Sequence, residues 1–157
     1  MPDWGKIGRV MFVCHGNICR SPMAQCVLAH MLSQSGRNDV CVESAATSTE
    51  ELGNPMHPGA MAELRRHGIP IIPHQAVQLR RGDASKYDIF IGMDMRNVWN
   101  MQRILGREAE DKCFRLLELC GMDRDIADPW YSDDFTSTWI DIEAGCAFLA
   151  EKLQCCF

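Results

Sequence analysis

A cysteine and an arginine, Cys14 and Arg20, flank five residues of a loop-forming segment. A thiolate is a nucleophile, and a guanidinium can bind a tetrahedral oxyanion through two parallel hydrogen bonds. The backbone amides of a tight loop, with the positive end of a following helix, form an anion site whose field also favours the thiolate. Such a thiolate can attack phosphorus and form a phosphocysteine. The segment therefore predicts phosphoryl transfer on Cys14, with Arg20 and loop amides stabilising the phosphate oxygens.

The residues around this pair fit the same chemistry. Gly16 and Asn17 tolerate the left-handed backbone that a tightly curled anion loop needs. Ser21 precedes Pro22 and is the expected N-cap of the next helix, from which its hydroxyl can also reach the thiolate of Cys14. A cysteine and an arginine at this spacing often occur by chance in a sequence. The prediction of a phosphate-binding loop therefore depends on the neighbouring residues described here.

Short apolar runs and amphipathic stretches alternate along the chain and define the elements that must position these residues. The patterns predict strands at 7–13, 39–45, 87–93 and 113–119, and helices at 23–35, 59–67, 94–105 and 136–154. This order predicts an α/β fold with a four-stranded parallel sheet and helices on both faces, as in flavodoxin-like proteins, and one domain over residues 1–157. Ligands of such sheets bind at the carboxyl ends of the strands, where Cys14 would lie.

Nine cysteines in 157 residues could instead indicate a disulfide scaffold or a metal site. The composition is 46% hydrophobic, which provides a core that disulfide-dense domains lack, and the chain has no C-x2-C pair. No secretory pattern is seen at the N-terminus, so we expect a reduced, cytoplasmic protein without metal or other cofactor. Five cysteines are interpreted as small core residues: Cys26, Cys41, Cys113, Cys120 and Cys146. The terminal Cys155 and Cys156 are interpreted as incidental.

Charge and hydropathy limit the classes of partner. The formal net charge is −5, which argues against a nucleic-acid groove as the main feature. No apolar run reaches the roughly 18 residues that indicate a membrane-spanning helix. No nucleic-acid or membrane partner is therefore expected, and we expect a monomer.

Several segments resemble the low-molecular-weight protein tyrosine phosphatases. Residues 13–24 resemble the signature V-C-x-G-N-x-C-R-S-P-x-A, and residues 44–48 resemble the S-A-A-T-S stretch. The G-N-P at 53–55, R-H-G-I at 66–69 and M-D-x-x-N at 93–97 match in order and spacing, and 128–131 resembles D-P-aromatic-aromatic. The resemblance covers nearly the whole chain. It implies the fold of that family and hydrolysis of phosphotyrosine proteins and small aryl phosphates, with acid-phosphatase-like activity.

The resemblance also implies catalytic and phosphate-binding roles. Cys14 would be the nucleophile and Arg20 would clamp the phosphate, with phosphate and other oxyanions as ligands. Asp128 would be the general acid and then the general base, and Pro129 would stiffen the backbone beside it. The remaining phosphate-binding residues would be His15, Gly16, Asn17, Ile18, Cys19 and Ser21.

Further roles concern the pocket and its support. Trp130 and Tyr131 would wall the pocket and stack on a phenyl ring, although core packing is an alternative for both. Ser44 and His74 would form, together with Asn17, the hydrogen-bond support of the loop. Cys19 would lie near Cys14, and the two would form a reversible disulfide after oxidation of Cys14, which makes the protein redox-sensitive.

The sequence departs from the family pattern in two places. Where the family usually has Gly-aromatic after A-A-T-S, this chain has Thr49 and Glu50. Glu50 is placed at the rim of the substrate pocket, where it would weaken aromatic packing and either favour substrates with basic neighbours or shift the preference among small aryl phosphates. The second departure is His57-Pro58-Gly59, which stands where the family often has Asp-x-Arg. The sequence alone assigns this departure no role.

Three other functions fit the sequence less well. An arsenate reductase needs two more redox cysteines after the third strand, but residues 93–101 contain none, and Cys113 and Cys120 flank the fourth predicted strand instead. A phosphocysteine carrier needs neither Arg20 nor an acid. A silent phosphotyrosine-binding module would lack Cys14, Arg20 or Asp128, and all three are present.

Overall fold

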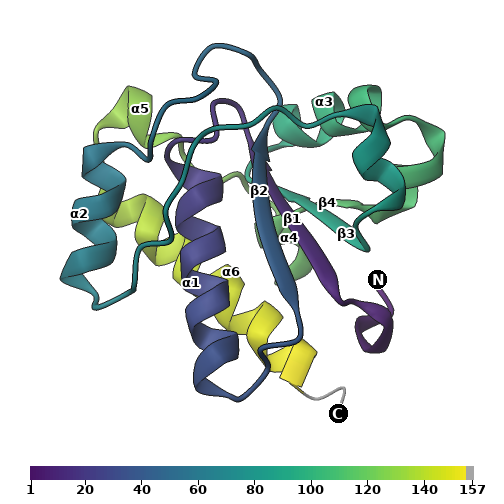
Figure 1. The fold of residues 1–157 in the computed structure, drawn as a ribbon, viewed down its shortest axis with the longest axis horizontal. Helices are drawn as coiled ribbons and strands as arrows, with labels where there is room; N and C mark the ends of the chain where they lie inside the picture. The colour runs from purple at the N-terminus through teal and green to yellow at the C-terminus, as the bar shows by residue number, and fades with distance from the viewer. Residues whose placement is uncertain (155–157) are drawn as a thin grey trace.

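The computed structural model describes residues 1–154 and contains one four-stranded parallel sheet (Figure 1). The strands are β1 (Arg9–Cys14), β2 (Cys41–Ala46), β3 (Ile89–Gly92) and β4 (Cys113–Arg115), in the order β2-β1-β3-β4. The predicted α/β class, the four parallel strands and the helices on both faces are confirmed. Because β1 is flanked by β2 and β3, its carboxyl end, with Cys14, lies in the middle of the sheet edge.

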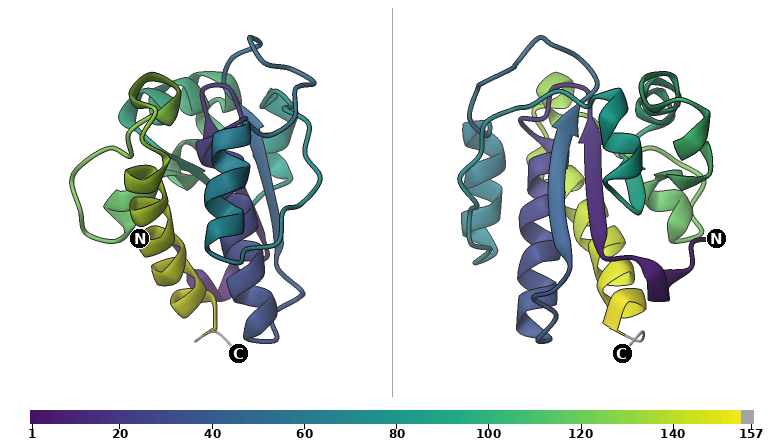
Figure 2. Two further views of the ribbon diagram at one scale, coloured as in Figure 1. Left: turned by 90° about the vertical axis from the view of Figure 1, so that its left-hand side faces the viewer. Right: turned by 45° about the vertical axis from the view of Figure 1, so that its right-hand side comes forward.

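Alternate residues of β1 face two different hydrophobic clusters, which explains why this strand is apolar throughout. Val10 and Phe12 face the cluster formed with α1 (Arg20–Gln34) and α6 (Phe135–Gln154). Met11 and Val13 face the second cluster, formed with α3 (Met95–Leu105). The helix α2 (Pro58–Arg66) packs against α1 and α6, and Figure 2 shows α1 and α6 running side by side. The sheet is thus covered on both faces.

The predicted fourth strand is only partly correct. The ladder ends at Arg115, and the next residues form the short helix α4 (Leu116–Leu119). The backbone N–H of Arg115 donates to Glu118 Oε1 at 2.7 Å and so begins this helical turn. Leu116, Leu117 and Leu119 are buried in either case, and a short buried apolar run has the same appearance in a strand and in a helix.

The predicted N-cap Ser21 is also wrong. The N-cap of α1 is Cys19, and the helix begins at Arg20. Pro22 therefore occupies the third helical position, where its missing N–H leaves no hydrogen bond of the helix unmade. Because Ser21 does not cap the helix, its hydroxyl can form hydrogen bonds with residues of the loop.

The other predicted helices are present within one or two residues of the expected bounds. Asp94 is the N-cap of α3, and its Oδ1 accepts from the Asn97 N–H at 2.7 Å. Short 3-10 helices occur at Trp4–Lys6, Arg81–Ser85 and Arg107–Lys112, and a four-residue helix, α5, at Pro129–Ser132. None of the helices within residues 1–154 is long and apolar enough to cross a membrane.

The burial of the cysteines differs from the prediction in two cases. Cys26, Cys113 and Cys146 are buried and free, as expected of small core residues. Cys41 and Cys120 are only half-buried: Cys41 begins the edge strand β2, and Cys120 is the C-cap of α4. Cys155 and Cys156 lie outside the described residues.

Candidate active site

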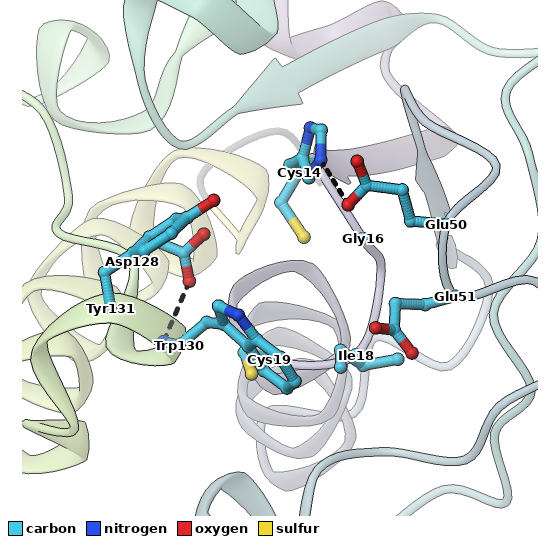
Figure 3. A pocket seen from close by; sticks show the side chains of 10 residues that line it. Cys14, Gly16, Ile18, Cys19, Glu50, Glu51, Asp128, Trp130 and Tyr131 are labelled. Atoms are coloured by element: carbon cyan, nitrogen blue, oxygen red, sulfur yellow. Dashed lines mark hydrogen bonds and ion pairs between the residues drawn. The ribbon is translucent and has the colours of Figure 1, made fainter.

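A pocket lies at the carboxyl end of β1, where three segments distant in the sequence meet (Figure 3). They are the loop after β1, the turn at residues 50–51 and the segment at residues 128–131. The lining residues are Cys14, His15, Gly16, Ile18, Cys19, Glu50, Glu51, Asp128, Trp130 and Tyr131. Most of the predicted site residues are therefore brought together.

Two donors face the sulfur of Cys14, which is 3% exposed. The Asn17 N–H donates to Cys14 Sγ at 3.3 Å, and Ser21 Oγ lies 3.0 Å from the same sulfur. Ser21 Oγ already accepts a hydrogen bond from Asn17 Nδ2 at 2.8 Å, so its own proton is available for the sulfur. Both contacts therefore direct a hydrogen-bond donor at the sulfur.

The guanidinium of Arg20 is almost fully buried and is held by three acceptors. It donates to Asp94 Oδ2 at 2.8 Å, to the Ile126 carbonyl at 2.9 Å and to Asp128 Oδ2 at 3.4 Å. Burial acts to lower the pKa of Arg20, but the negative charges of Cys14, Asp128 and Asp94 outweigh it and raise the pKa above its usual range. Arg20 therefore stays charged. From the sequence, Asp94 is placed only at the start of a helix, and its contact with Arg20 is not identified.

Asp128 is the N-cap of α5, and both its oxygens have donors. Oδ1 accepts from the Trp130 N–H at 3.1 Å, and Oδ2 accepts from Arg20. Pro129 is the first residue of that helix, where its fixed backbone favours the turn. The Asp128 carboxyl group faces the Cys14 sulfur across the pocket (Figure 3).

Asn17 holds the backbone of the loop. It has a φ of +59°, which is uncommon outside glycine. Its Nδ2 donates to Ser44 Oγ at 3.0 Å as well as to Ser21, and its Oδ1 accepts from the Val77 N–H at 3.0 Å. Nε2 of His74 lies 2.6 Å from the Asn17 carbonyl oxygen. The predicted contacts of Ser44 and His74 with Asn17 are present.

The left-handed backbone predicted for Gly16 is wrong, because only Asn17 within the loop has a positive φ. A Cβ at Gly16 would instead lie 3.4 Å from Glu51 Cγ. At that distance a Cβ would make an ordinary van der Waals contact. Glu51 lines the pocket, where the sequence analysis did not place it.

The mouth of the pocket is acidic on one side and aromatic on the other (Figure 3). Glu50 Oε2 lies 3.0 Å from His15 Nε2, beside Glu51. Trp130 is 55% exposed and Tyr131 is 81% exposed, so the alternative of core packing is wrong for both. An aromatic ring entering the pocket would meet these two side chains.

Cys19 is a second thiol in the pocket. Burial, reinforced by the negative charges of Cys14 and Asp128, raises the pKa of Cys19 to about 12. Cys19 therefore remains a neutral thiol at neutral pH. Cys14 and Cys19 are both free thiols here. Within the part of the chain that the structure describes, no cluster of His, Cys, Asp and Glu could hold a metal ion.

Known proteins are similar to this chain over most of its length. The family model of the low molecular weight phosphotyrosine protein phosphatases matches residues 9–155. A low molecular weight protein-tyrosine-phosphatase of Staphylococcus saprophyticus, PtpA, is 36% identical over 138 residues, covering 87% of this chain and 88% of that protein. YfkJ from Bacillus subtilis has a crystal structure with a TM-score of 0.89 at 32% identity, covering 95% and 96% of the two chains. Vibrio vulnificus Wzb in complex with benzylphosphonate has a TM-score of 0.83 at 26% identity, covering 94% and 99%.

We expect Asn17→Ala to lower the free energy of unfolding by about 2–4 kcal/mol, because it leaves buried partners unpaired and strains the left-handed backbone. Asn17→Gly loses the same hydrogen bonds without the strain, so it should be more stable than the alanine variant by about 1 kcal/mol. Urea unfolding measures both. Equal stability of the two variants would contradict the assigned backbone strain, and parental stability in both would contradict the network.

We expect His74 to make stability depend on pH. Burial lowers the pKa of His74 below 6.5, although the contact with the Asn17 carbonyl partly opposes this. Below pH 6.5 the unfolded chain therefore binds more protons at this site than the folded chain, and stability falls as pH falls towards the lowered value. In His74→Gln, an amide can keep the donor without titrating. The stability difference between parent and variant should be constant above pH 6.5 and shift against the parent below it. Parallel pH curves in urea unfolding would contradict this assignment.

Proposed function

The chain belongs to the low molecular weight phosphotyrosine protein phosphatase family and is a protein-tyrosine-phosphatase, and we propose that it acts through a phosphocysteine on Cys14. The observation that carries this mechanism is the meeting of Cys14 and Asp128 in one pocket, with Arg20 bound to Asp128. A nucleophile, an anion clamp and a proton donor are what cleavage of a phosphate ester requires.

In the first proposed step, the Cys14 thiolate attacks phosphorus and the ester P–O bond breaks. Protonated Asp128 gives its proton to the leaving oxygen, which otherwise departs as a poorly stabilised phenoxide. Arg20 and the amides of the loop stabilise the equatorial oxygens. The phosphate-binding residues of this loop are proposed to be His15, Gly16, Asn17, Ile18, Cys19 and Ser21.

In the second proposed step, water hydrolyses the phosphocysteine. The Asp128 carboxylate takes a proton from the water, whose oxygen attacks phosphorus while the S–P bond breaks. Cys14 leaves as a thiolate, and the hydrogen bond from Ser21, whose oxygen lies 3.0 Å from the sulfur, supports that leaving group. Inorganic phosphate is the product.

Aryl esters are the proposed substrates, both phosphotyrosine proteins and small aryl phosphates. Trp130 and Tyr131 present exposed rings at the mouth of the pocket, suited to stacking on a phenyl ring. The benzylphosphonate bound by the Vibrio vulnificus relative is an aryl-bearing oxyanion, which supports this substrate class. Other oxyanions, phosphate included, should bind competitively.

The broader assignments rest on this mechanism. Residues 1–157 are proposed to form a single phosphatase domain, monomeric, without a cofactor. A cytoplasmic location is proposed because the Cys14 thiolate works only when reduced. Peroxide would convert it to a sulfenic acid, which would then condense with the Cys19 thiol to give a disulfide and water. The presence of both thiols in one pocket supports this redox step.

We expect Cys14→Ser to abolish hydrolysis of p-nitrophenyl phosphate, because the nucleophile is lost. Asp128→Ala should lower the rate by about 10²–10⁴, the usual contribution of a general acid. Steady-state kinetics measures both, and Cys41→Ser, a thiol on the edge strand β2, is the matched control that should stay active. Full activity of Cys14→Ser, or dependence on added metal, would overturn the mechanism.

We expect Glu50→Tyr to raise kcat/KM for aryl phosphates whose aryl group carries no charge, because it replaces a carboxylate with a ring at the rim. Preference for phosphopeptides with a basic neighbour should fall by a few-fold, as for a solvent-exposed ion pair. Glu50→Gln removes the charge without adding a ring, so it should change the peptide preference alone. Unchanged relative kcat/KM across these substrates would refute the role of Glu50.

A further inference from the structure

His57 joins the phosphate loop to the segment that carries Asp128. Its backbone N–H donates to the Ile18 carbonyl at 2.8 Å, in the middle of the loop. Its ring meets the ring of Trp130 edge to face, with centroids 5.8 Å apart and an interplanar angle of 86°. One residue therefore contacts both halves of the pocket.

The ring of His57 is fixed on two further sides. Its Nδ1 accepts from the Gly59 N–H at 2.9 Å and so caps α2, which leaves the ring proton on Nε2. The ring of Phe135 stacks on it, with centroids 5.1 Å apart at 26°. A Cβ at Gly59 would lie 2.4 Å from Phe135 Cε2, so glycine is needed there for Phe135 to pack against the start of α2. The orientation of the His57 ring is therefore fixed by Gly59 and Phe135 as well as by its contact with Trp130.

Trp130 in turn holds Asp128. Its backbone N–H donates to Asp128 Oδ1 at 3.1 Å within the four-residue helix α5. So short a helix has little stability of its own, and its orientation depends on contacts with other elements. The Trp130 side chain is half exposed, and His57 supplies a contact from α2 that limits its movement.

We propose that His57 is a positioning residue that sets the place of the Asp128 carboxyl group relative to the phosphate loop, through Trp130. The inference rests on the proposed role of Asp128 as general acid. It assigns a role to the histidine that stands where related phosphatases often have an aspartate. A proton donor displaced by a fraction of an ångström transfers its proton less well, so loss of the ring should weaken protonation of the leaving oxygen.

Two substitutions separate the ring from the cap. His57→Asn keeps a side chain suited to the N-cap of α2 and removes the ring. His57→Phe keeps a ring between Phe135 and Trp130 and removes the Nδ1 acceptor. Stability, measured by urea unfolding, should fall mainly in His57→Phe. The efficiency of acid catalysis should fall mainly in His57→Asn.

The readout is the dependence of kcat/KM on the leaving group, since kcat/KM reports the steps up to phosphocysteine formation. Phenyl phosphate needs a proton on its leaving oxygen, whereas 2,4-dinitrophenyl phosphate has a stable phenolate and needs none. We expect His57→Asn to lower kcat/KM about tenfold for phenyl phosphate, a part of the usual general-acid contribution, and less than twofold for the dinitrophenyl ester. His57→Phe should retain most of the parental ratio between the two substrates.

His67 provides a matched control. Its ring stacks on Trp139 at 4.0 Å and 3°, a histidine–tryptophan contact between α2 and α6 outside the pocket. His67→Asn should lower stability without changing the ratio of the two substrates. Equal losses on both substrates in His57→Asn, or a ratio in His57→Phe as low as in His57→Asn, would overturn the proposal.

Asp128→Asn separates this inference from the proposed function. If Asp128 is the acid, this variant loses far more activity with phenyl phosphate than with the dinitrophenyl ester, and adding His57→Asn causes little further loss. Equal losses on both substrates in Asp128→Asn would refute the acid role itself, and the positioning role with it. A strong leaving-group effect in Asp128→Asn with full additivity in the double variant would refute only the role of His57.

Discussion

The buried positive charge of Arg20 is the constraint around which the site is organised. Burying a guanidinium is unfavourable unless anions and hydrogen-bond acceptors surround it. Asp94 lies between β3 and α3, whereas Ile126 and Asp128 come from the segment before α5, and all three bind Arg20 at the start of α1. The Ile126 N–H also donates to the carbonyl of Met93 at 2.9 Å, beside Asp94. Solvating one charge therefore brings the nucleophile loop, the strand end and the acid-bearing segment to the same place.

The loop itself is built on a second constraint, the left-handed residue Asn17. One side chain meets Ser21, Ser44 and the Val77 N–H, so a strained backbone is held from α1, from β2 and from the connection after α2. These contacts orient two donors towards the Cys14 sulfur. The Asn17 N–H donates to it directly, and because Ser21 Oγ accepts from Asn17 Nδ2, its own proton is available for the sulfur. The positive potential of the site thus comes from preorganised dipoles and from Arg20, which explains why a chain of net charge −5 can hold an anion site.

The sheet and its helices could be predicted because they follow from periodicity and caps that lie next to each other in the sequence. Asp94 and Gly106 mark the two ends of α3 in this way. The features that were predicted wrongly or missed do not follow from such local patterns. The apolar pattern predicts a strand through residues 116–119 because burial looks alike in a strand and in a helix. It predicts Ser21 as a cap, whereas α1 begins at Arg20. The second contact of Asp94, with Arg20, and the two contacts of His57 join distant segments, and no local pattern encodes them.

The two halves of the pocket differ in exposure, and the proposed mechanism gives a chemical reason. In that mechanism the nucleophile keeps one geometry through both steps, and Cys14, Asn17 and Arg20 are each at most 3% exposed. The proposed acid meets first a leaving group and then a water molecule at the same place, which requires an accessible carboxyl group on a segment that lets the phenol leave. The Asp128 side chain is accordingly 22% exposed and lies on a four-residue helix with exposed rings. In the positioning role proposed for His57, its edge-to-face contact with Trp130 anchors this exposed segment to the start of α2.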